Sequence, residues 1–166
     1  MSVETWKKEF YPKKPNSKSL LVLAKRCLKK WEGTKKQNLK KHKVIPLGHE
    51  LYFEDENHDK EWFSLNKSSC PFYCLAEEKI EEILQKNEKV NIPELRINFC
   101  DYCHIKKAVG RGCDISVNDS FSPWESFFNN HDPLPMIDLI NEYIKIFKKS
   151  KKTQRNRNEK FSKKRN

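Results

Sequence analysis

The spacing of the cysteines constrains this chain more than any other feature of its sequence. Five of the six cysteines lie between Cys70 and Cys113. Four of these form a Cys-x3-Cys pair and a Cys-x2-Cys pair, and the fifth follows after nine further residues. Closely spaced cysteines turn two thiolates toward one point, and two such pairs complete a tetrahedral zinc site. The sequence therefore predicts one bound zinc, with five candidate ligands: Cys70, Cys74, Cys100, Cys103 and Cys113.

Five candidates for four positions leave open which cysteine is the spare one. His104 adjoins the second pair, but neighbouring side chains rarely face the same ion, so we expect it not to bind. His42, His49 and His58 lie outside the pairs and are expected at the surface. Cys27 falls on an apolar helical stripe, where a small core residue is the natural interpretation. A site made only of thiolates is closed, so we expect a structural zinc rather than a catalytic one.

The chain shows no catalytic constellation. A zinc deaminase needs a His-x-Glu before Pro-Cys-x-x-Cys, and that order is absent. An HNH nuclease needs a histidine between the two pairs, and residues 75–99 contain none. Only four glycines are present, too few to suggest a phosphate-binding loop. We therefore expect a protein that is not an enzyme.

The expected location is the cytoplasm, in the host cell if the protein is viral. No signal-peptide pattern opens the chain, and the longest apolar run, residues 20–24, is too short to cross a bilayer. No membrane partner is expected. Clustered cysteines in a reducing compartment bind metal more often than they form disulfides, so a secreted disulfide scaffold is the less favoured alternative.

The positive charge is concentrated at the two ends of the chain. Residues 1–44 carry 14 Lys and Arg against three Glu, and residues 148–166 carry ten against one. Residues 45–147 are acidic, with ten basic residues against 19 Asp and Glu. Basic ends predict contact with the phosphates of nucleic acid or of a ribonucleoprotein. The candidate residues are Lys25, Arg26, Lys29, Lys30, Lys35, Lys36, Lys40, Lys41, Lys151, Lys152, Arg155 and Arg157.

Two other interpretations of the charge stay open. A lysine-rich chain can simply reflect an AT-rich genome and a need for solubility. Alternatively, the acidic segment, residues 45–147, binds a host protein and inhibits or redirects a host enzyme. The binding surface of this segment would then include Glu54, Asp55, Glu56 and Asp59.

Periodicity predicts a mainly helical fold in the first part of the chain. Residues 1–16 are expected to form an extended arm, attached to the core by Trp6 and Phe10. An amphipathic helix then begins near Ser17 or Ser19 and ends at Gly33. Thr34 is expected to cap a second short helix through residue 43. Residues 46–65 are expected to form a loop or an irregular hairpin.

In the second part, helices are expected over residues 75–85, from Ser122 onward and over residues 134–150, the last capped by Asp132. A short strand is expected at 95–99, followed by a turn at 110–112. Residues 148–166 are expected to form a basic tail that is disordered without a partner. The expected fold is mainly α with a short β element: one small domain, residues 17–147, organised around one structural zinc.

Several motifs resemble small uncharacterised cysteine-rich proteins of bacteriophages and prophages. These carry a Lys-Trp-Glu-Gly segment and an Asn-Leu-x-x-His segment, matched here by residues 30–33 and 38–42. A Cys-Pro-x-Cys knuckle, a Cys-x-x-Cys-Pro stretch and a Gly/Cys turn follow. The chain offers Cys70-Pro71-Phe72-Tyr73-Cys74, Cys100-Asp101-Tyr102-Cys103 and Gly110-Arg111-Gly112-Cys113.

The resemblance covers about residues 18–130, with one extra residue in the first knuckle, His104 in place of proline and Ser122-Pro123-Trp124 in place of Thr-Pro-Tyr. The extra residue makes Cys74 a less expected zinc ligand and Cys113 a more expected one. The resemblance implies a zinc-binding phage accessory protein with no established activity, so phage origin and a role in host–virus interaction are expectations.

Overall fold

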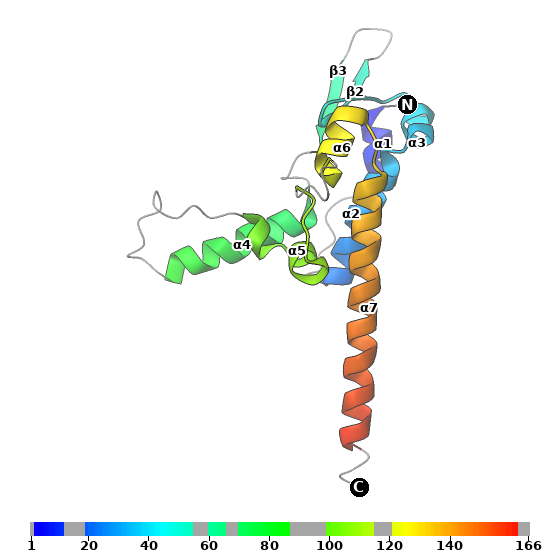
Figure 1. Ribbon diagram of the computed structural model, residues 1–166. Coiled ribbons are helices and arrows are strands. Elements are labelled where there is room, and N and C mark those ends of the chain that lie inside the picture. Colours follow the sequence, from blue (N-terminus) through cyan, green and yellow to red (C-terminus); the bar gives the residue numbers. More distant parts are fainter. Residues whose placement is uncertain are drawn as a thin grey trace.

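Helices make up most of the described structure, and a three-stranded antiparallel sheet packs beside them (Figure 1). The computed structural model describes residues 2–11, 19–54, 60–65, 70–86, 99–114 and 121–162. The elements in chain order are α1 (Val3–Phe10), α2 (Leu20–Gly33), α3 (Lys36–His42), β1 (Ile45–Leu47), β2 (Glu50–Glu54), β3 (Lys60–Ser64), α4 (Pro71–Lys86), the 3-10 helix η3 (Phe99–Tyr102), α5 (His104–Val109), α6 (Pro123–Asn130) and α7 (Leu134–Ser162).

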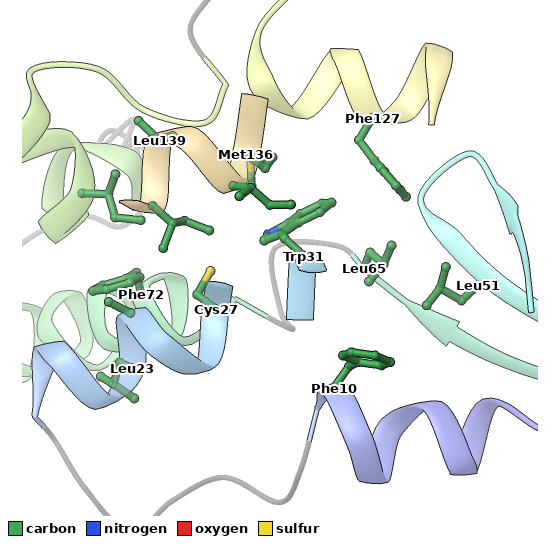
Figure 2. Close-up of a cluster of buried hydrophobic side chains, with 14 of the residues drawn as sticks. Phe10, Leu23, Cys27, Trp31, Leu51, Leu65, Phe72, Phe127, Met136 and Leu139 are labelled. Atoms are coloured by element: carbon green, nitrogen blue, oxygen red, sulfur yellow. The ribbon is translucent and has the colours of Figure 1, made fainter. Parts of the chain in front are cut away.

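The core is built around α2, which packs against α1, α4 and α7. Its apolar stripe, at the three- and four-residue spacing that the sequence shows, buries Leu23, Ala24, Cys27 and Trp31. The Trp31 ring meets the ring of Phe127 from α6 edge-on, with the centroids 5.1 Å apart. Figure 2 shows Trp31 between Phe127 and Met136, at the point where α2, α6 and α7 converge.

The first residues form the helix α1, so the expectation of an extended arm was wrong. Ser2 and Thr5 form a reciprocal capping box that satisfies backbone groups at the start of this helix. Trp6 and Phe10 are buried, as expected, because they share one helical face. The indole Nε1 of Trp6 donates a 2.9 Å hydrogen bond to the Gly33 carbonyl, which fastens α1 to the end of α2.

The strands β1, β2 and β3 form an antiparallel meander, where a loop or an irregular hairpin was expected over residues 46–65. The strands lie in the order β1-β2-β3, with Ile45 opposite Tyr52 and Tyr52 opposite Trp62. Leu51 is buried beneath this sheet, whereas Ile45 and Trp62 are 61% and 62% exposed. One face of the sheet therefore covers the core, and the other carries apolar side chains at the surface.

The last helix is longer than expected. The side chain of Asp132 accepts a hydrogen bond from the backbone N–H of Leu134, which confirms the expected cap. The body packs against the first half of α7, where Leu139, Ile140 and Tyr143 are buried. Disorder was expected from residue 148 onward. The helix instead continues through Ser162 and projects beyond the body (Figure 1). Lys, Gln, Arg and Glu have high helix propensity, which allows the helix to continue without apolar contacts.

Candidate metal centre and basic helix

The first cysteine pair lies at the start of α4. Cys70 precedes the helix, Pro71 is its first residue, and the backbone N–H of Cys74 donates a 3.1 Å hydrogen bond to the Cys70 carbonyl. Proline is favoured there because its fixed φ suits a helix and its missing N–H is not needed. The helix therefore begins within the pair, not after it, and both thiols are half-buried and free of disulfides.

The second pair and the fifth cysteine surround α5. Cys100 lies in η3, and its side chain is outside the part of the molecule that the structure describes. Cys103 occupies the position before α5, and the turn at Gly110, with a φ of 82°, leads to Cys113. The Cys113 carbonyl accepts a 2.9 Å hydrogen bond from the backbone N–H of Trp124, so this segment is fixed against α6.

Cys27 on α2 meets the thiols of the cysteine-rich segment. It is buried as expected, at 1% exposure, but its thiol is in hydrogen-bonding contact with the thiol of Cys70. That contact, then burial, raises the pKa of Cys27 well above its ordinary value, and nearby Cys113 raises it further. Burial is also the main cause of the raised pKa of Cys103, with a contribution from Cys70. The described cysteines thus lie in one region: Cys70 and Cys113 lie near Cys27, and Cys103 lies near Cys70. Cys74 belongs to the same region, because burial and then the neighbouring thiols Cys74, Cys70 and Cys27 raise the pKa of Tyr11.

Within the described residues, no three Cys, His, Asp or Glu side chains are already arranged to hold a metal ion. Histidines do not supply the missing geometry. His104 is exposed and His49 is half-buried, while His58 lies outside the described residues. His42 is 4% exposed, which corrects the expectation of a surface position.

His42 has a structural explanation. Its Nε2 lies 2.9 Å from a Glu9 carboxylate oxygen and its Nδ1 lies 3.1 Å from the Thr5 hydroxyl. This order of hydroxyl, imidazole and carboxylate resembles a catalytic triad. However, the Thr5 hydroxyl also donates a 2.8 Å hydrogen bond to the Ser2 carbonyl as part of the helix cap. The three side chains therefore tie α1 to α3.

Lys30, expected at a nucleic-acid surface, is buried at 1% exposure. Its Nζ lies 5.1 Å from the centre of the Trp31 ring, and its positive charge lowers the pKa of Cys27. Lysine is rarely buried completely unless a favourable partner offsets the cost of leaving water. Because Lys30 lies three residues after Cys27, the two side chains are neighbours on α2.

The other basic candidates divide into two groups, one on α2 and α3 and one on α7, and α2 itself packs against α7 (Figure 1). On α2 and α3, Arg26 is half-buried over the Tyr11 ring at 4.4 Å, and Lys41 forms a 2.8 Å ion pair with Glu9. Lys35 is half-buried. The exposed members of this group are Lys25, Lys29, Lys36 and Lys40. The second group, Lys151, Lys152, Arg155 and Arg157, lies on the projecting part of α7 and is exposed.

The projecting part of α7 carries its charge mainly on one side. Every side chain from Lys148 to Arg157 is exposed, and the first acidic residue in this stretch of sequence is Glu159. Lys148, Lys151, Lys152 and Arg155 follow the spacing that places residues on a single helical face. The ammonium group of Lys151 also lies 5.2 Å from the centre of the Phe147 ring, where the apolar face ends.

Comparisons with protein-family models, with curated proteins and with solved structures find no match to this chain. None of the helices in the described segments combines the length and apolar composition needed to cross a membrane.

Proposed function

We propose that the protein acts by binding, not by catalysis, and that the projecting half of α7 contacts the phosphate backbone of nucleic acid, alone or within a ribonucleoprotein. The observation that carries the proposal is the exposed basic face of this helix. From Lys148 to Arg157 the helix spans about 15 Å, a length over which a duplex presents several phosphates. The positive charge is densest in this part of the chain, because residues 148–166 carry ten Lys and Arg against one Glu, whereas residues 1–147 carry 24 against 22 Asp and Glu.

The structure favours α7 over the other basic group. Around α2 and α3, Lys30 is buried, Lys41 is paired with Glu9, and Arg26 stacks on Tyr11. These side chains already serve the fold. We therefore assign the main phosphate contacts to α7.

Fluorescence anisotropy with random-sequence duplex DNA and single-stranded RNA, measured over a range of KCl concentrations, tests this assignment. If about three cations engage phosphates, the logarithm of the association constant should fall with a slope of roughly −3 against the logarithm of salt for duplex DNA. The probe that the protein binds with higher affinity identifies the preferred nucleic acid. Absence of salt-dependent binding to both probes would contradict the proposal.

Two matched variants locate the binding surface. Lys151→Gln, Lys152→Gln and Arg155→Gln remove three charges from α7 while keeping good helix formers. Lys25→Gln, Lys36→Gln and Lys40→Gln remove three exposed charges from α2 and α3. We expect the first variant to lose more than about tenfold in affinity and the second to stay within about threefold of the wild type. Equal losses would show that net charge, and not α7, determines binding.

A second candidate function is the binding of a host protein, and the exposed sheet face favours it. Ile45, Tyr52 and Trp62 lie side by side across the three strands, and Leu47 on the same face is 67% exposed. Exposed apolar groups of this kind often mark protein interfaces. The acidic residues Asp55, Glu56 and Asp59, expected to contribute, lie outside the described residues, as does the side chain of Glu54. A protein retained by the wild type after nuclease treatment, and lost with Trp62→Lys, would support this function.

A further inference from the structure

We propose that Thr5, Glu9 and His42 form a proton-dependent latch between α1 and α3. The latch is closed while both ring nitrogens of His42 carry a proton, and it loosens when the Nδ1 proton is lost. Because α1 also packs against α2, β2 and β3, the latch acts on how the start of the chain is held to the core. It is independent of nucleic-acid binding through α7.

The hydrogen bonds of the Thr5 hydroxyl determine which atom carries the proton between Thr5 and His42. This hydroxyl donates its one proton to the Ser2 carbonyl at 2.8 Å, and its oxygen accepts the Ser2 backbone N–H at 2.9 Å. A hydroxyl has one proton and two lone pairs, so one lone pair remains. Nδ1 of His42 lies 3.1 Å from this oxygen and can bond that lone pair only as an N–H donor. Nδ1 is therefore protonated in this arrangement.

The other ring nitrogen also needs a proton. Nε2 of His42 lies 2.9 Å from Oε2 of Glu9, and an ionised carboxylate only accepts hydrogen bonds. The ammonium group of Lys41 donates to both oxygens of this carboxylate at 2.8 Å, which lowers the pKa of Glu9 and keeps it ionised. The two acceptors on opposite sides of the ring are satisfied together only by the imidazolium form, which has two N–H donors.

The charges around His42 favour and oppose its second proton. Glu9 on α1 favours it, whereas the exposed lysines that adjoin Glu9 and His42 in sequence oppose it, Lys41 most directly because it shares the carboxylate. Of the other elements packed against α3, α2 offers the neutral carbonyl of Glu32 to Asn38, and β1 has no charged residue. His42 is 4% exposed, so solvent screens these charges only weakly.

Loss of the Nδ1 proton affects the start of α1. Nε2 keeps its proton because Glu9 only accepts, so a bare lone pair on Nδ1 then faces the Thr5 oxygen. The hydroxyl can bond this lone pair only by turning its proton away from the Ser2 carbonyl, which disturbs the capping box of α1. Since the closed latch binds the proton more tightly than the open one, the docking of α1 weakens as the pH rises.

NMR of the imidazole nitrogens in the full-length protein tests the latch by counting the ring protons of His42 between about pH 6 and about pH 9. We expect two ring protons at about pH 7.5, with the exposed His131 as the internal reference. Thr5→Val removes the acceptor of the Nδ1 proton and should lower the pH at which this proton is lost by about one unit, a tenfold change in proton affinity. The matched variant Thr5→Ser keeps the hydroxyl and should behave like the wild type.

A single ring proton on His42 over this whole range, or equal shifts in Thr5→Val and Thr5→Ser, would contradict the latch. Amide hydrogen exchange of the wild type supplies a second test if Thr5→Val folds poorly. After correction for intrinsic rates, protection in α1 should fall at least about threefold more than protection over residues 137–144 between about pH 7 and about pH 8.5. Protection in α1 that follows residues 137–144 at every pH would overturn the proposal.

Discussion

Gly33 determines how closely α1 approaches α2. A Cβ atom added at this position would lie 2.5 Å from Cγ and 2.6 Å from Cβ of Phe10, and 2.8 Å from Cζ2 of Trp6. Real structures do not show such short contacts, so the two aromatic side chains would have to move. The same helix end also holds the Trp6 indole through the Gly33 carbonyl. The absence of a side chain is thus required by packing at this position.

We predict that Gly33→Ala destabilises the protein. Overpacking costs about 1–3 kcal/mol, which outweighs the roughly 0.5–1 kcal/mol that alanine gains over glycine in a helix. Urea denaturation followed by tryptophan fluorescence measures the change in unfolding free energy. Gly110→Asn is the control, because no atom lies within 4 Å of the added Cβ and asparagine tolerates positive φ. Gly33→Ala at wild-type stability would contradict the docking of α1.

Glu9 makes the docking of α1 on α3 sensitive to acid. The hydrogen bond from Lys41 is the largest cause that lowers the pKa of Glu9 below its ordinary value of 4.5, and His42 adds to the effect. A lowered pKa in the folded state means that the unfolded state binds the proton more tightly. The contribution of Glu9 to stability is therefore complete above about pH 4.5 and is lost as the pH falls through the lower, folded-state value.

We predict that Glu9→Gln reduces the dependence of stability on pH in this acidic range. Urea midpoints of the wild type and the variant, compared between about pH 7 and about pH 3, should converge as the pH falls. The difference should be small, because exposed ion pairs contribute little to stability. The exposed Glu81 on α4 provides a control substitution, Glu81→Gln. A difference that grows toward low pH would show that the sign of the linkage is wrong.

Single residues also show what sequence reasoning can reach. The burial of Cys27 and Trp31 followed from helical spacing, because the period of α2 fixes which side chains share a face. The contact of Cys27 with Cys70 could not follow, since it depends on how two distant elements pack. The burial of Lys30 had a detectable signal: it follows Cys27 by three residues and Leu23 by seven, which places it at the edge of the apolar stripe. Sequence analysis had placed it off that stripe.

Among the elements, α7 consists of a buried half and an exposed half. Tertiary contacts protect the backbone around Leu139 and Ile140, while the side chains from Lys148 to Arg157 are all exposed. Isolated helices of this length are only marginally stable in water. The helical form of the basic segment therefore depends on propagation from the packed half of the same helix.

We predict that amide hydrogen exchange is at least about tenfold faster over residues 149–157 than over residues 137–144. Addition of the preferred nucleic acid should slow exchange in the exposed half, because bound phosphates stabilise the helical conformation there. The amides of α3 serve as an internal control and should not change. Equal protection along all of α7 in the free protein would indicate that another part of the chain covers the basic segment.

The elements that sequence analysis missed were short ones. The helix α1 was not predicted because its sequence contains two lysines and precedes a segment with two prolines. The three- and four-residue spacing of Val3, Trp6 and Phe10 was nevertheless that of a helix. The β meander carried the alternation of Leu51 and Phe53, but acidic and turn-forming residues interrupt it. The caps at Ser122 and Asp132 were predictable, because capping depends on local backbone groups. The expected strand at 95–99 lies mostly outside the described residues.

At the scale of the whole molecule, charge and cysteines are segregated. The basic end of α7 projects from one side, and the sheet and α3 lie at the opposite end (Figure 1). The helices α2, α4 and α5, which carry or adjoin the described cysteines, pack together with α7 in the middle. A zinc held by the two cysteine pairs, as their spacing predicts, would join α4 to α5 there. Its removal should therefore loosen the middle of the molecule more than the sheet, because β1–β3 are held by their own hydrogen bonds and by α1.

We predict that a zinc chelator lowers the melting temperature of the zinc-loaded wild type by at least about 5 °C, because a ligand bound only to the folded state contributes its binding free energy to stability. Hydrogen exchange should accelerate in α4 and α5 and stay nearly constant in β2 and β3. Cys103→Ser should already melt at the lower temperature and respond little to the chelator. If the chelator destabilises Cys103→Ser as much as the wild type, the second cysteine pair does not hold the metal, and the middle of the molecule is joined by a different set of cysteines.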